Sequence, residues 1–61
     1  MRNRYRLTFT FTDTEEEARA ICDRYTATAT PYARKKHPAF YRAWTSSDGR
    51  EHKFIAWTYT N

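Results

Sequence analysis

The chain has 61 residues, which is enough for one small domain over residues 1–61 and too few for a large hydrophobic core. Its only cysteine, Cys22, excludes a disulfide within the chain, and a fold this small commonly gains its extra stability by self-association instead. Eleven Lys and Arg residues against seven Asp and Glu residues give a net charge of +4, and this basic balance favours acidic partners.

The opening stretch MRNRYRLTFTF alternates polar and apolar residues, so it lacks the apolar run that an export signal requires. No window of the chain is apolar enough for a transmembrane helix. We therefore expect a cytoplasmic protein that does not contact a membrane.

Residues 4–12, RYRLTFTFT, alternate strictly between two sets of side chains. Alternation with period two, in a stretch rich in aromatic and β-branched residues, predicts a half-buried β-strand. One side of this strand carries Tyr5, Leu7, Phe9 and Phe11, and the other carries Arg4, Arg6, Thr8, Thr10 and Thr12.

The period changes over residues 13–26, which predict an amphipathic helix. The apolar stripe of this helix consists of Ala18, Ile21, Cys22 and Tyr25. Either Asp13 or Thr12 can cap the helix, because a glutamate follows each of them three residues later. The consecutive glutamates at 15–17 fan around the first turn, where the helix dipole favours anions, so they indicate a helix start and not a metal or catalytic site.

The remaining chain predicts a loop followed by a β-hairpin. Residues 27–38 contain the basic run RKKH between two prolines and are the longest predicted irregular stretch. A strand follows over residues 39–46, and Asp48-Gly49 favours the tight turn that leads to the last strand. That last strand carries Ile55, Trp57 and Tyr59 on one face and His52, Phe54, Ala56 and Thr58 on the other.

This order predicts an α+β fold, β-α-β-β, with a three-stranded antiparallel sheet in the spatial order 2-3-1 and one helix packed on one face. We expect the helix to cover the face that carries Trp57. The strand over residues 39–46 adds to the bare face either Phe40, Arg42 and Trp44 or Tyr41 and Ala43, because two-residue and three-residue turns pair strands in opposite phase. The other side chains expected on the bare face are Arg4, Arg6, Thr8, Thr10, His52, Phe54 and Thr58.

The bare face allows three interpretations: it binds nucleic acid, it pairs with a second copy of the chain, or it stays hydrated. The basic run at 34–37 lies in a loop bounded by prolines, where a hydrated charge cluster is commoner than a binding site. For contact with an anionic partner we select six cations, Arg4, Arg6, Arg34, Lys35, Lys36 and Arg42. For self-association or contact with another protein we select Thr8, Thr10, His52 and Phe54.

Catalysis and metal binding have weaker support. A metal-independent ribonuclease would need an acid, a base and phosphate-binding cations, for which the candidates are His37, His52, Glu51, Arg42, Arg50 and Lys53. Of these, Glu51, His52 and Lys53 are consecutive in the chain, so neighbouring side chains lie on opposite faces of a strand. One cysteine and two histidines fifteen positions apart match no metal-ligand spacing, and a chain with one glycine cannot build a phosphate loop. We therefore expect no enzyme, no catalytic residue, no metal and no cofactor.

No helix-turn-helix, zinc-finger or ribonucleoprotein signature is present. We expect a small accessory or binding protein that self-associates and uses a basic and aromatic surface to bind DNA or RNA. The alternative is a protein-interaction module that adapts or inhibits a larger partner. A basic, aromatic, cofactor-free chain of this size also suits an accessory gene of a phage or mobile element.

Overall fold

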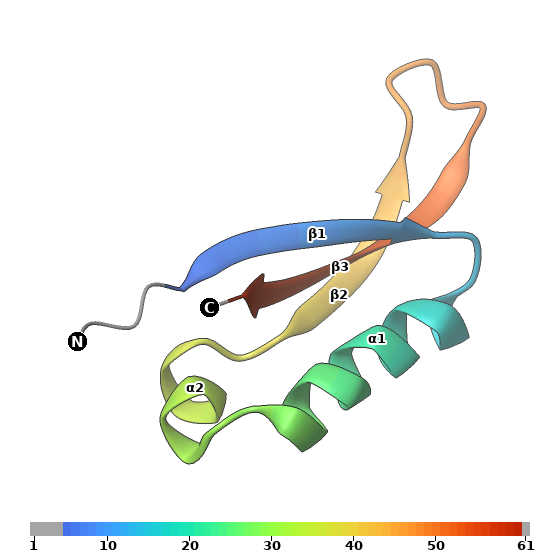
Figure 1. Cartoon of the computed structure of the whole chain (residues 1–61). Helices are drawn as coiled ribbons and strands as arrows, with labels where there is room; N and C mark the ends of the chain where they lie inside the picture. The colour runs from blue at the N-terminus through green and yellow to red at the C-terminus, as the bar shows by residue number, and fades with distance from the viewer. Residues whose placement is uncertain (1–4, 61) are drawn as a thin grey trace.

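A computed structural model describes residues 5–60 and contains three strands and two helices in this range (Figure 1). In chain order these are β1 (Arg6–Thr12), α1 (Glu15–Thr28), α2 (Pro31–Lys36), β2 (Phe40–Thr45) and β3 (His52–Thr60). The strands form one antiparallel sheet in the order β1-β3-β2, and α1 lies along one face of it. The predicted α+β class, strand order and covering helix are confirmed.

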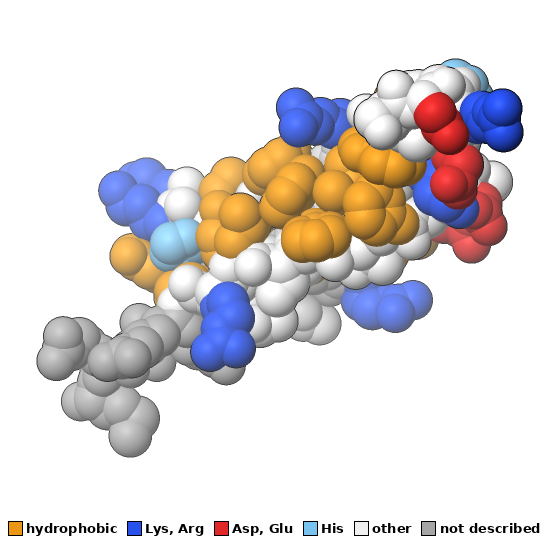
Figure 2. All heavy atoms as spheres, turned by 90° about the horizontal axis from the view of Figure 1, so that it is seen from above, with side chains coloured by type: hydrophobic (Ala, Val, Ile, Leu, Met, Phe, Trp, Pro, Cys, Tyr) orange, Lys and Arg blue, Asp and Glu red, His pale blue; other side chains and the backbone are white. Residues whose placement is uncertain are grey.

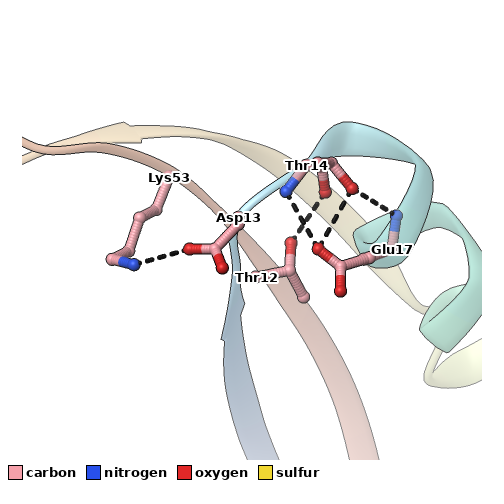
Figure 3. A network of polar contacts seen from close by, with 5 residues as sticks. All are labelled: Thr12, Asp13, Thr14, Glu17 and Lys53. Atoms are coloured by element: carbon pink, nitrogen blue, oxygen red, sulfur yellow. Dashed lines mark hydrogen bonds and ion pairs between the residues drawn. The ribbon is translucent and has the colours of Figure 1, made fainter.

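The helix α1 begins just after both of its predicted caps. Thr14 is the N-cap, because its Oγ1 accepts the backbone N–H of Glu17 at 3.2 Å and Glu17 Oε1 accepts the N–H of Thr14 at 3.2 Å (Figure 3). The prediction that Asp13 or Thr12 caps the helix is wrong. Strand β1 runs through Thr12, whose hydroxyl donates to the Thr14 carbonyl, and the carboxylate of Asp13 is bound to Lys53.

A second helix, α2, occupies part of the stretch that was predicted to be irregular. The Thr30 hydroxyl caps it by accepting the Ala33 N–H at 3.1 Å, and Pro31 fits the first turn because it has no N–H that needs a partner. The basic run therefore lies in the last helical turn and not in a loop. The Tyr25 hydroxyl donates to the His37 carbonyl at 2.7 Å and ties the end of α2 to α1.

The turn between β2 and β3 fixes the register of the hairpin. The Ser46 N–H donates to the Glu51 carbonyl at 3.0 Å and the Gly49 N–H donates to the Ser46 carbonyl at 2.9 Å. Gly49 has φ of 74°, the only positive value among residues 5–60, so the turn predicted from Asp48-Gly49 needs the left-handed conformation at the glycine alone.

Directly opposed residues of an antiparallel sheet share a face, so the register sorts the side chains. Phe9, Trp57 and Phe40 form one row across the three strands. Phe11, Ile55 and Arg42 form the next row on the same face. The second strand therefore places Phe40, Arg42 and Trp44 on the face of Trp57, and Tyr41 and Ala43 on the opposite face.

The helix covers the face opposite to Trp57. Its buried residues Ala18 and Cys22 pack against Ala56, and Phe54 and Tyr41 surround this cluster. The prediction that α1 covers the Trp57 face is therefore wrong, and the side of the sheet with Thr8, Thr10, His52, Phe54 and Thr58 is not the bare one. A period-two pattern separates two faces but does not say which one a helix covers. No helix within residues 5–60 has the length and hydropathy needed to span a membrane.

Candidate functional site

The bare side of the sheet is an apolar surface, which we call the aromatic face (Figure 2). Four of its side chains are exposed, with fractions of 46% for Leu7, 55% for Phe9, 44% for Phe11 and 47% for Phe40. Isolated exposed apolar residues are ordinary, but a continuous group of this kind marks an interaction surface. The aromatic face consists of Leu7, Phe9, Phe11, Phe40, Trp44, Ile55 and Trp57.

The rings of this face pack on one another in T-shaped, tilted and stacked pairs and form one layer. The centroids of Phe11 and Trp44 are 5.0 Å apart, and those of Phe9 and Phe11 are 5.7 Å apart. Trp57 continues the layer, with its centroid 5.2 Å from Phe9 and 5.9 Å from Phe40. Because each ring already contacts another ring of the chain, the layer is a preformed surface that spans all three strands.

Charge is sparse on this face. Its register positions within the described strands hold two cations, Arg42 and Lys53, and no acid. Lys53 Nζ is 2.8 Å from Asp13 Oδ1 (Figure 3), and this hydrogen bond and ion pair raise the pKa of Lys53 and lower the pKa of Asp13. Arg42 has no acidic partner among residues 5–60. The face is thus apolar with one unpaired cation.

The second candidate surface lies at the end of the sheet where α2 sits. Three consecutive cations, Arg34, Lys35 and Lys36, form the last turn of α2, are exposed, and make no ion pair within the described residues. Arg6 lies at the same end, because the neighbouring Tyr5 ring stacks on His37 with centroids 4.3 Å apart. We call Arg6, Arg34, Lys35 and Lys36 the cationic end.

Aromatic side chains accompany these cations. The centroid of His37 is 4.8 Å from that of Tyr59 and 5.8 Å from that of Tyr32, whose side chain is 58% exposed. Beneath them lies a pocket of about 210 Å³ lined by side chains without formal charge. Burial, followed by the charges of Tyr5 and Tyr59, raises the pKa of Tyr25 in this pocket above the ordinary 10. The lining residues are Tyr5, Tyr25, Thr28, Ala29, Thr30, Ala33 and Tyr59.

Most of the acidic residues gather at the opposite end of the molecule, and the exception is Asp23 within α1. Glu15, Glu16 and Glu17 form the first turn of α1, and Asp48 and Glu51 lie in the hairpin turn beyond β2. Figure 1 shows α2 and this hairpin at opposite ends, and Figure 2 shows red side chains only at the hairpin end. The molecule is 45 Å long, and these carboxylates lie at the end away from the cationic end, together with the cations Arg50 and Lys53.

The predicted site residues are divided among these regions. Arg34, Lys35, Lys36 and Arg6 share the cationic end, Arg42 lies on the aromatic face, and Arg4 is outside the described residues. Thr8, Thr10 and Phe54 lie on the helix side, where Thr8 Oγ1 is 3.2 Å from Thr58 Oγ1 and Phe54 contacts the core.

The candidate acid and base of a ribonuclease are not brought together. His37 closes α2 and stacks on Tyr5, whereas His52 is at the far end of the sheet with its Nδ1 3.5 Å from Thr45 Oγ1. Within the part of the chain that the structure describes, no three His, Cys, Asp or Glu residues are placed to hold a metal ion.

Comparison with protein-family models, curated proteins and solved structures finds no match to this chain. The arrangement of the two surfaces is therefore the basis for inferring function. Sequence analysis missed one of them, the aromatic face. Its signal was present in Leu7, Phe9 and Phe11, but the pattern was assigned to the core beneath the helix.

Proposed function

We propose that the protein is a small nucleic-acid-binding protein that contacts the phosphate backbone through its cationic end. The observation that carries this proposal is the last turn of α2, where three exposed consecutive cations have no acidic partner among residues 5–60. Phosphate contacts by Lys and Arg supply most of the sequence-independent affinity for nucleic acid, because they release bound counterions.

The local structure suits this role. The negative end of the α2 dipole stabilises the cations without neutralising them, so they remain available to an external anion. The half-exposed Tyr32 ring lies in the same helix and offers a stacking surface for an unpaired base. The distant position of the carboxylates in the first turn of α1 and in the hairpin turn keeps their repulsion of a polyanion away from this end.

The aromatic face is less suited to the same ligand. A sheet that binds single strands combines stacking rings with several cations that follow the backbone. Here the rings pack on one another, and Arg42 is the only cation on the face without a partner in the described chain. We therefore assign the nucleic-acid contact to α2 and leave the aromatic face for a different partner.

The test is a fluorescence-anisotropy titration with single-stranded and double-stranded DNA and RNA at several salt concentrations. The double variant Lys35→Gln, Lys36→Gln should bind more weakly to every sequence. The slope of log affinity against log salt should become shallower by about 1.8 for duplex DNA and about 1.4 for single strands. Each phosphate contact releases about 0.9 of a counterion from duplex DNA or about 0.7 from a single strand, and the variant loses two such contacts.

A matched control is Arg42→Gln, Arg50→Gln, which removes the same charge from β2 and the hairpin turn. This control should keep the salt slope of the native chain. An equal loss of affinity and of salt slope in both double variants would show that net charge or the sheet face, and not α2, governs nucleic-acid binding. Absence of binding by the native chain at low salt would contradict the proposal and favour a protein-interaction module.

A further inference from the structure

We propose that the aromatic face is the interface of a homodimer in which two sheets stack face to face. This inference goes beyond nucleic-acid binding, because it concerns a different surface and does not require a polyanion. It starts from an imbalance across the sheet. The buried residues under α1, Ala18, Cys22 and Ala56, are small, and the larger side chains around them are only partly buried. On the other side of the sheet, Leu7, Phe9, Phe11 and Phe40 are 44–55% exposed.

A single copy has very little enclosed core. The buried apolar residues within 5–60 are Ala18, Cys22, Ala33, Ile55 and Ala56, and no large side chain there is fully buried. Domains of about 60 residues are marginally stable even with a normal core. Covering the aromatic face would convert a two-layer fold into a four-layer one and would enclose the largest side chains of the chain.

The exposed area is of the size that a dimer needs. Full burial of an aromatic ring removes about 150–250 Å² from water, so four side chains that are about half exposed supply on the order of 400 Å² per copy. Two copies supply about 800 Å², and the partly exposed Trp44 and Trp57 bring the sum to roughly 1,000 Å², the lower bound for a specific interface. The area fits a weak dimer whose population depends on concentration.

The pattern of the face is self-complementary. A two-fold axis that runs along β3 between the sheets places β2 of one copy over β1 of the other, because β1 and β2 flank β3 on opposite sides. The row Phe11, Ile55, Arg42 then lies opposite the same row of the second copy in reverse order, so that Ile55 faces Ile55. Each Arg42 lies over a Phe11 ring of the second copy, an arrangement that a cation–π contact favours.

Among the described residues, the like charges that this pairing opposes are the two Lys53 side chains, because β3 lies on the axis. Each Lys53 is neutralised by Asp13 of its own copy, and no acid lies on the face within the described strands. Facing sheets in β-sandwiches pack about 10 Å apart and within about 30° of alignment, so near-parallel stacking of the two three-stranded sheets is the ordinary geometry. The buried Cys22 lies on the helix side, so an intermolecular disulfide plays no part.

The first test is sedimentation equilibrium of the native chain over a wide range of concentration, without nucleic acid and with reductant. We expect twice the mass of a 7.4 kDa chain at high concentration and dissociation on dilution. Trp44 and Trp57 both lie on the face, so acrylamide quenching of tryptophan fluorescence should rise as the dimer dissociates. A monomer at every concentration, or dissociation without a change in quenching, would overturn the proposal.

A pair of variants locates the interface. Phe9→Lys puts a charge at the centre of the aromatic face, and Thr10→Lys puts the same charge on the next residue of β1, which points to the helix side. We expect Phe9→Lys to raise the dissociation constant at least tenfold and Thr10→Lys to leave it unchanged. Loss of the dimer in Thr10→Lys alone would place the interface on the other face. The quenching measurement on the native chain still decides the question if Phe9→Lys does not fold.

Failure of this proposal is separable from failure of nucleic-acid binding. The double variant Lys35→Gln, Lys36→Gln changes only α2, so we expect it to sediment as a dimer like the native chain. Loss of the dimer in this variant would mean that α2 forms the interface. A native monomer that binds phosphatidylcholine vesicles would show that lipid covers the aromatic face. A native monomer that loses nucleic-acid binding on Phe9→Lys would show that bases cover it. Either result overturns the homodimer.

Discussion

At the scale of single residues, small side chains set the contact between α1 and the sheet. Ala18 is 0% exposed and Ala56 is 1% exposed, so the helix approaches the central strand closely at this point. A larger side chain here would force the helix away from β3, because protein interiors leave no room for added methylene groups.

Ala18→Leu should therefore lower the free energy of unfolding by about 1–3 kcal/mol, the usual cost of overpacking. Ala20→Leu makes the same change at an exposed position of α1 and should stay within about 0.5 kcal/mol of the native chain. Urea denaturation followed by circular dichroism measures both values. Equal values for the two variants would mean that Ala18 does not carry the helix–sheet contact.

At the scale of elements, the capping box couples the end of β1 to the start of α1. The Thr14 hydroxyl and the Glu17 carboxylate satisfy donors that a helix start otherwise leaves unpaired. Thr14→Ala should lower the free energy of unfolding by about 1 kcal/mol. Thr26→Ala is a matched control in α1: its hydroxyl donates to the Cys22 carbonyl, and alanine is the better helix former there, so this variant should be neutral or more stable. A larger loss in Thr26→Ala would contradict the assigned cap.

Local patterns explain which elements could be predicted. Alternation over β1 and β3 is long enough to define both strands and their pairing, and the helical stripe around Ala18 and Cys22 defines α1. The helix α2 has six residues, too few for a periodic pattern, and its only signal was the pair Thr30-Pro31, a cap followed by a proline. A proline also marks a loop boundary, so this pair alone does not predict a helix.

At the scale of the whole molecule, the choice of covered face could not be predicted from alternation. Both faces of the sheet hold aromatic residues, Phe54 and Tyr41 on one side and Phe9 and Trp57 on the other. Larger apolar side chains gain more free energy on burial, so the sequence favours the face with Phe9 and Trp57 as the one under the helix. In the structure, Ala18 and Cys22 of α1 pack against Ala56, and the large side chains Leu7, Phe9, Phe11 and Phe40 of the other face remain exposed. The cationic run was predictable because its members are consecutive, whereas its place beside Tyr5 and Arg6 depends on the fold.

Acid should weaken the whole fold at the hairpin end, where two carboxylates have pKa values below the ordinary 3.8. Lys53 lowers the pKa of Asp13, and hydrogen bonds from the Ser46 hydroxyl and the Arg50 N–H lower the pKa of Asp48. The unfolded chain takes up protons at these groups before the folded chain does, so their contribution is present above about pH 3.8 and is lost as the pH falls through the folded values.

The urea midpoint of the native chain should therefore drop as the pH falls below about 3.8, and the drop should be smaller in the double variant Asp13→Asn, Asp48→Asn, because those positions no longer titrate. Protein concentration must be the same at each pH, since dissociation of a dimer also lowers the midpoint on dilution. Glu16→Gln removes an exposed carboxylate with no hydrogen bond among the described residues and should keep the full drop. If the double variant loses as much stability as the native chain, the acid sensitivity arises elsewhere and the two turn contacts do not couple folding to protonation.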